Sequence, residues 1–186
     1  MCIVYRAAME LRADANIPFP RPVVFAAYRD KLLDMLPYLP NVRAIEIRKR
    51  EDDGQVVKLL NFWKGGGDIP AAARAFVSEA MLSWLDRATW NEADFTCEWK
   101  IEPQAFTEAI TCVGKNRFLE DGEKTRLEIR GVLEIDAKKI KGVPGFLSGK
   151  VSKAVEDLLV SKIKPNLVST AEGLTKYLEA RDGKLT

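Results

Sequence analysis

The chemistry open to this chain is limited by residue type, because its 186 residues include no histidine. Ser-His-Asp and Cys-His catalysis, His-ligated zinc and the two-His-one-carboxylate iron site all require that side chain. The enzymatic routes that remain use Asp, Glu, Lys or Tyr to move protons, or rely on binding and orientation alone. Histidine-dependent catalysts are therefore excluded for these residues.

Asp86 is the candidate that combines reactivity with an unusual position. It falls on the apolar face of a predicted strand, where leaving a polar group without a partner costs about 1–3 kcal/mol. A desolvated carboxyl has a raised pKa, so Asp86 could act as a general acid or base, orient a ligand hydroxyl, or accept the indole N–H of Trp99. The structural alternative is that Arg87, or the backbone at a strand end, satisfies it. Asn116 shares this face, and Asn61 is a third polar candidate.

The three cysteines, Cys2, Cys97 and Cys112, are an odd number at no metal-ligand spacing. This pattern fits a reducing compartment, so we expect no metal centre and a buried reduced pair at Cys97 and Cys112, although a disulfide between them is conceivable. The N-terminal residues lack the basic start and long apolar core of a signal peptide, and no apolar membrane span is visible. We therefore expect a cytoplasmic protein.

The composition, with 47% hydrophobic and 30% charged residues, is typical of a soluble globular protein, and the length fits one domain over residues 1–186. A formal net charge of +2 is too small to indicate a nucleic-acid partner. One basic stretch, Lys138, Lys139 and Lys141, interleaves with apolar residues and could touch an anionic membrane, each lysine adding about 1 kcal/mol. The alternative for this stretch is a solvated surface.

Strands, with short helices after the first of them, must position these side chains. Residues 3–11 alternate apolar and polar types, which predicts a half-buried strand. Pro22 then opens the first of two short helices, broken near Asp30. The next predicted elements are a strand at 42–50, a strand at 55–63 after the turn Asp52-Asp53-Gly54, a flexible loop at 64–68 and a short helix at 69–77.

The stretch from Trp84 to Ile135 predicts a meander of four antiparallel strands with one apolar inner face. The turns that close this meander are placed on Glu92-Ala93, Gln104-Ala105 and Asp121-Gly122. The cross-strand pairs that follow include Trp90 with Phe95, Asp86 with Trp99, Trp99 with Ile110, Cys97 with Cys112, and Gly114 with Ile129. The inner-face glycines, Gly114 and Gly131, either widen the space in front of the sheet or curve the sheet.

The residues from about Gly145 to Ala180 predict one amphipathic helix, which would be about 50 Å long at ~1.5 Å per residue. A helix of that length must lie along the sheet, and its apolar stripe would cover the inner face. Pro165 removes one backbone hydrogen bond, so it should kink or split the helix, or act as a hinge. Strands that curl around one long helix leave a space, which predicts an internal cavity.

This order of elements resembles the helix-grip fold of the START-like, or Bet v 1-like, superfamily. The segments that carry the resemblance are Pro20-Arg21-Pro22-Val23-Val24-Phe25, Tyr28-Arg29-Asp30 and Leu36-Pro37-Tyr38-Leu39-Pro40-Asn41-Val42. The resemblance implies an α+β fold in which a curved seven-stranded antiparallel sheet wraps around a long C-terminal helix, with an apolar ligand held between them. Members include carriers of lipids, sterols and quinones, plant ligand binders, and polyketide aromatases or cyclases.

The leading functional prediction is binding or transfer of a lipid-like hydrophobic molecule, with no cofactor and no covalent step. The alternative is a cofactor-free polyketide cyclase or aromatase with Asp86 as general acid or base. A third class is a filled-core module that binds another protein. The predicted ligand contacts are Asn61, Trp63, Trp84, Asp86, Trp90, Trp99, Cys112, Gly114, Asn116, Ile129, Val155 and Leu159.

Overall fold

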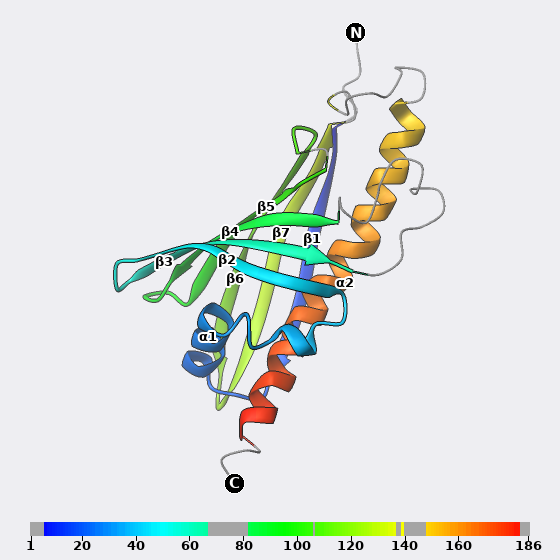
Figure 1. The fold of residues 1–186 in the computed structure, drawn as a ribbon. Helices are drawn as coiled ribbons and strands as arrows, with labels where there is room; N and C mark the ends of the chain where they lie inside the picture. Colours follow the sequence, from blue (N-terminus) through cyan, green and yellow to red (C-terminus); the bar gives the residue numbers. More distant parts are fainter. Residues whose placement is uncertain (1–5, 67–81, 106, 137–138, 140–147, 183–186) are drawn as a thin grey trace.

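One curved antiparallel sheet and one long helix form most of the chain (Figure 1). The computed structural model describes residues 6–66, 82–105, 107–136, 139 and 148–182, with backbone alone at 6–7 and 148–164. The elements in chain order are β1 (Arg6–Ile17), α1 (Arg21–Asp30), the 3-10 turn η1 (Leu36–Tyr38), β2 (Val42–Asp52), β3 (Val56–Gly65), β4 (Ser83–Asn91), β5 (Thr96–Pro103), β6 (Ile110–Asp121), β7 (Lys124–Asp136) and α2 (Ser148–Asp182).

The sheet has seven strands in the order β1-β7-β6-β5-β4-β3-β2, and every neighbouring pair is antiparallel. β1 pairs with β7 along its whole length, so the first strand lies beside the last. Its alternation is the one expected from sequence, with Leu11 and Ile17 buried and Glu10 and Arg12 exposed. The predicted helix-grip architecture is confirmed.

The three predicted hairpin registers of the meander are wrong, each by an even number of residues. Trp90 pairs with Cys97 rather than Phe95, because residues 92–95 form a longer turn in which Phe95 has a φ of 52°. Trp99 pairs with Gly114, and β7 closes on a turn at Gly122, whose φ is 61°. Side chains alternate with a period of two, so an even shift keeps the same residues on the inner face.

Trp99 crosses the inner face at two glycines. Gly114 lies opposite Trp99 on β6, and Gly131 lies opposite Gly114 on β7. A Cβ atom at Gly114 would lie 2.6 Å from Cη2 of Trp99, and one at Gly131 would lie 2.7 Å from the same atom. The indole therefore occupies the space in front of both glycines, so these residues make room for Trp99 rather than widening the cavity.

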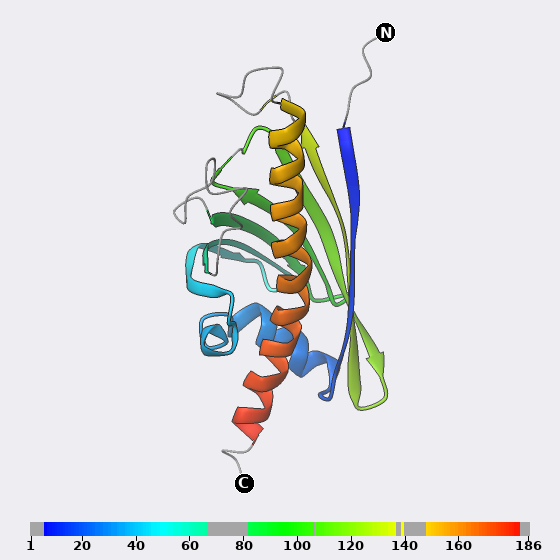
Figure 2. The same cartoon turned by 90° about the vertical axis from the view of Figure 1, so that its right-hand side faces the viewer.

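α2 runs along the concave side of the sheet as one continuous helix (Figure 2). Pro165 lies inside it, so the prediction of a split there is wrong, while a kink or hinge stays a prediction. At the C-terminal half, Gly173 lets the helix approach η1 closely, since a Cβ there would lie 2.6 Å from Cδ2 of Leu39. Tyr177 adds an edge contact with Tyr38, with ring centroids 6.3 Å apart. These contacts seat α2 on η1.

α1 closes one end of the sheet through an aromatic cluster. Phe25 contacts Trp90, Phe95 and Phe118 edge to face, with ring centroids 5.2–5.3 Å apart. Such pairs each contribute about 0.5–1.5 kcal/mol beyond the area they bury. The second predicted short helix is only the 3-10 turn η1. The predicted loop begins later than expected, because β3 continues to Gly65.

Several sequence predictions fall outside the described residues. These are the short helix at 69–77, Lys138 and Lys141 of the basic stretch, and the side chains of Val155 and Leu159. Within the helices that are described, none is both long and apolar enough to span a membrane.

The first prediction concerns the Trp99 contact. Gly114→Ala should lower the free energy of unfolding by about 1–3 kcal/mol, because the added methyl overpacks against the indole and the Arg130 carbonyl oxygen, 2.5 Å away. Urea denaturation measures the change. The matched control is Val113→Ala on the outer face of the same strand, where the side chain is 38% exposed.

Trp99→Phe in the Gly114→Ala background should recover part of the lost stability, since the shorter ring does not reach the new methyl group. A Gly114→Ala variant as stable as Val113→Ala would show that a methyl group at position 114 does not overpack against the indole.

Candidate functional site

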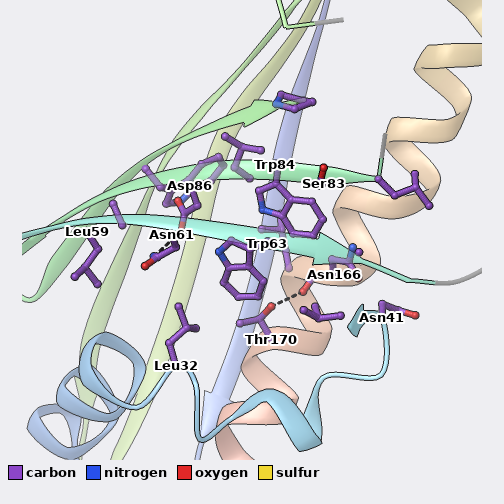
Figure 3. Close-up of a pocket in the computed structure, with 18 of the residues that line it drawn as sticks. Leu32, Asn41, Leu59, Asn61, Trp63, Ser83, Trp84, Asp86, Asn166 and Thr170 are labelled. Atoms are coloured by element: carbon purple, nitrogen blue, oxygen red, sulfur yellow. Dashed lines mark hydrogen bonds between the residues drawn. The ribbon is translucent and has the colours of Figure 1, made fainter. Parts of the chain in front are cut away.

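A cavity of about 200 Å³ lies between the inner face of the sheet and the helical elements (Figure 3). Strands β3, β4, β5 and β6 supply its floor, α1 and the chain around Asn41 one wall, and α2 the side opposite the sheet. Most lining side chains are aromatic or aliphatic, and a small number of polar groups lie among them. This mixture is typical of a small-molecule site.

Seven of the twelve predicted contacts line this cavity: Asn61, Trp63, Trp84, Asp86, Trp90, Trp99 and Asn116. Cys112, Gly114 and Ile129 do not line it. The Trp99 ring lies over Gly114, and the other two are buried at 0% and 2% exposure. Val155 and Leu159 cannot be placed among the described side chains. A role for any of these residues in ligand binding stays a prediction.

Asp86 and Asn61 form the polar centre of the cavity. They lie directly opposite each other on β4 and β3, and the Asn61 amide Nδ2 donates to Asp86 Oδ2 at 3.3 Å. Asn61 is only 1% exposed, and its Oδ1 has no hydrogen-bond partner among the described residues. Figure 3 shows the pair on the far side of Trp63 and Trp84 from α2. The predicted partner Arg87 is not used, since its side chain points outward and donates to Glu102 Oε2 at 3.0 Å.

Burial changes the acid-base behaviour of this carboxyl. Desolvation raises the pKa of Asp86 from 3.8 to about 6, while the donors on Asn61 and Trp63 act in the opposite direction. The Trp63 Nε1–H group favours the charged form of Asp86 and so lowers its pKa, but Nε1 has no hydrogen-bond partner among the described residues. Burial also raises the pKa of the Tyr28 hydroxyl and of the Cys97 thiol, so both stay neutral near pH 7. Among the described residues that line the cavity, Asp86 is therefore the one that can titrate near neutral pH.

Trp99 does not bond Asp86, contrary to one expectation from sequence. Its indole Nε1 donates to Asn116 Oδ1 at 2.8 Å, a buried bond that satisfies the indole donor. Asp86 instead lies opposite Ile101. The predicted neighbours Cys97 and Cys112 are also separated, and both are buried and free of disulfides.

The aromatic side chains form two walls. Trp63 and Trp84 lie opposite each other on β3 and β4 and stack with ring centroids 5.8 Å apart at an interplanar angle of 13°. Trp90 and Tyr28 form the other wall, edge to face at 5.2 Å. The inner-face positions of β4 place Asp86 between Trp84 and Trp90, so the carboxyl lies between the two walls.

The described lining residues on the helices are not among the predicted ligand contacts. Tyr28 follows Phe25 by three residues and precedes Leu32 by four, so this spacing could have placed it on the inner face of α1. On α2 the described lining residues are Asn166, Leu167 and Thr170, of which only Leu167 is apolar. The two polar residues carry no hydrophobic signal that would reveal them.

Within the described part of the chain, no group of Cys, Asp and Glu side chains is arranged so that it could hold a metal ion. The described cavity lining holds Asp86 and, apart from the neutral Tyr28 and Cys97, no other titratable side chain.

Solved structures share this architecture. The chain is similar to a protein of Thermus thermophilus (22% identity, TM-score 0.63, covering 93% of this chain and 99% of that one). It is similar to the Zhui aromatase/cyclase of a Streptomyces species (15% identity, TM-score 0.62, covering 94% of this chain and 96% of that one). It is also similar to norcoclaurine synthase of Thalictrum flavum (13% identity, TM-score 0.60, covering 94% of this chain and 88% of that one). The chain has the helix-grip fold, which these solved structures share.

No protein-family model and no curated protein sequence matches this helix-grip chain. The similarity lies in the fold, at 22% sequence identity or less for the structures named above. What the helix-grip cavity does must therefore be argued from its own residues.

The second prediction follows from the raised pKa of Asp86. The folded protein binds the proton of the Asp86 carboxyl more tightly than the unfolded chain does. The folding stability that comes from this protonation is therefore complete below pH 3.8 and is lost as pH rises through about 6. Asp86→Asn should remove this pH dependence and raise the free energy of unfolding at neutral pH by on the order of 2 kcal/mol.

Urea denaturation of both proteins between about pH 4 and pH 7.5 measures the difference. Asp34→Asn, a change at an exposed aspartate outside the cavity, is the matched control. An Asp86→Asn variant that keeps the pH dependence of the parent would contradict a buried, destabilising carboxylate.

Proposed function

We propose that this helix-grip protein binds a hydrophobic small molecule in the cavity beneath α2 without forming a covalent bond to it. The observation that carries the proposal is a space of about 200 Å³ walled by four indoles and several aliphatic side chains. Protein cores normally pack to the density of organic crystals, so side-chain packing alone does not require a space of this size. A lipid-like molecule or a flat polycyclic one matches such a lining.

The distribution of polar groups supports the same proposal. Asn61, Asp86 and Asn116 are the inner-face polar residues of β3, β4 and β6, and each lies among apolar neighbours. Asn116 is bonded by Trp99, whereas Asn61 Oδ1 has no hydrogen-bond partner among the described residues. Ligand sites commonly combine an apolar lining with a few polar groups that fix orientation.

Filling the cavity should abolish binding. Ile101 lines the cavity beside Asp86, so Ile101→Trp places a large ring in the ligand space. We expect the affinity for the neutral fluorescent probe N-phenyl-1-naphthylamine to fall by at least about tenfold, as measured by fluorescence titration.

Val113→Trp makes a similar apolar-to-indole change on the outer face and should leave the affinity for the probe unchanged. The proposal fails if Ile101→Trp binds the probe as well as the parent, or if the parent binds no probe and native mass spectrometry finds no bound species.

A second candidate is a cyclase or aromatase-like enzyme that uses the same cavity. The observation that favours it is the raised pKa of Asp86, about 6, which suits a general acid or base near neutral pH. An aromatase/cyclase and norcoclaurine synthase are among the structures that share the fold. In this case the cavity walls would hold the substrate in a reactive conformation while Asp86 moves a proton.

Asp86→Asn separates the two candidates. With a poly-β-ketone thioester as test substrate, an enzyme should lose roughly 10²–10⁴-fold in cyclised product, followed by liquid chromatography, while probe binding is retained. A binding protein should give no product above the uncatalysed background with either the parent or the variant.

Transfer of a ligand between membranes would add a surface that meets a bilayer. Lys139 is exposed and pairs with Asp136 at 3.8 Å, whereas Lys138 and Lys141 lie outside the described residues. The basic stretch therefore stays a predicted membrane contact.

A further inference from the structure

Among the described lining residues, the cavity has a negatively charged side chain and no positively charged one. No Lys or Arg side chain belongs to its described lining, and the acidic group present is Asp86. Among the described residues this carboxylate forms no ion pair, and its hydrogen bond, to Asn61, is long at 3.3 Å. The cavity therefore holds a negative charge for which no described side chain supplies the counter-charge.

The aromatic walls add negative electrostatic potential to the charge of Asp86. Indole and phenol faces carry negative electrostatic potential and attract a cation placed over them. Trp63 and Trp84 stack on one side of Asp86 along β3 and β4, and Trp90 and Tyr28 lie on the other side. A positively charged group beside Asp86 would therefore meet a carboxylate and the faces or edges of several rings in one small space.

We propose that the cavity selects a hydrophobic amine, bound in its protonated form with the ammonium group against Asp86 and the apolar body along the indoles. This inference rests on the proposed function and specifies the ligand class of that site. The same charge should exclude anionic lipids such as fatty acids, which carry a carboxylate on a similar apolar body. A neutral alcohol should bind with intermediate affinity, because its hydroxyl can donate to Asp86 without neutralising it.

The protein has already desolvated the carboxylate on folding, which favours this selection. Burying an unpaired charge is unfavourable, and a buried pair of opposite charges recovers part of that energy. The ligand therefore meets a preorganised charge and must lose only the hydration of its own ammonium group. Among the described residues, the titratable groups that face Asp86 are Tyr28 from α1 and Cys97 from β5, and both remain neutral.

Three probes with one apolar body test the proposal: 2-(2-naphthyl)ethylamine, 2-(2-naphthyl)ethanol and 2-naphthylacetate. Isothermal titration calorimetry at about pH 7.5 should rank the amine roughly tenfold or more tighter than the alcohol, and the carboxylate weakest. In Asp86→Asn the amine should lose this advantage over the alcohol, and binding of the carboxylate should strengthen. Asp34→Asn should keep the ranking of the parent.

Proton linkage provides a second readout. Because an ammonium group favours the charged form of Asp86, amine binding at about pH 6 should release protons from the parent, seen as a binding enthalpy that depends on the ionisation enthalpy of the buffer. Asp86→Asn should show no such release.

The outcomes are distinct. Equal affinities for the three probes, or a preference for the carboxylate, would overturn the ammonium proposal and leave hydrophobic binding in place. Failure of all three probes to bind, together with failure of N-phenyl-1-naphthylamine, would overturn both.

Discussion

The indole of Trp99, held over two glycines, is the contact on which the shape of the cavity depends. Gly114 and Gly131 lie opposite each other on β6 and β7, and a methyl group on either would collide with the ring. Because the ring fits there, Trp99 extends across β6 and its N–H reaches Asn116. Trp99 also lines the cavity. The two glycines thus fix the position of a ring that forms part of the cavity lining.

The position of Trp99 also determines which hydrogen-bond donors reach the Asp86 carboxyl. Asn116 accepts the indole N–H at 2.8 Å, so this donor is not available to the carboxyl. Asp86 keeps Asn61 at 3.3 Å, and burial raises its pKa to about 6. The ionised carboxylate lowers folding stability at neutral pH, and it lies in the lining of the cavity. Such a conflict between stability and local chemistry is typical of functional sites.

The sequence was sufficient to predict the fold and the inner face of the sheet, because alternation with a period of two survives any even error in register. It was not sufficient for the register itself. The turn between β4 and β5 includes Phe95 at a φ of 52°, a conformation that bulky residues rarely adopt. Tertiary contacts accompany it, since Phe95 packs against Phe25 at 5.2 Å and under the Arg21 guanidinium at 4.2 Å. Local turn propensities contain no information about those partners.

That one turn has a chemical consequence. A two-residue turn at Glu92-Ala93 would place Asp86 opposite Trp99, where the indole could satisfy the carboxylate. The longer turn moves Asp86 opposite Ile101 and Trp99 opposite Ala88, which leaves the carboxyl between aromatic walls with a single amide donor. The polarity of the cavity therefore depends on how α1 holds Phe95, at the opposite end of β4 and β5 from Trp84. The charge in the site is a result of strand register, and register is decided by packing outside the site.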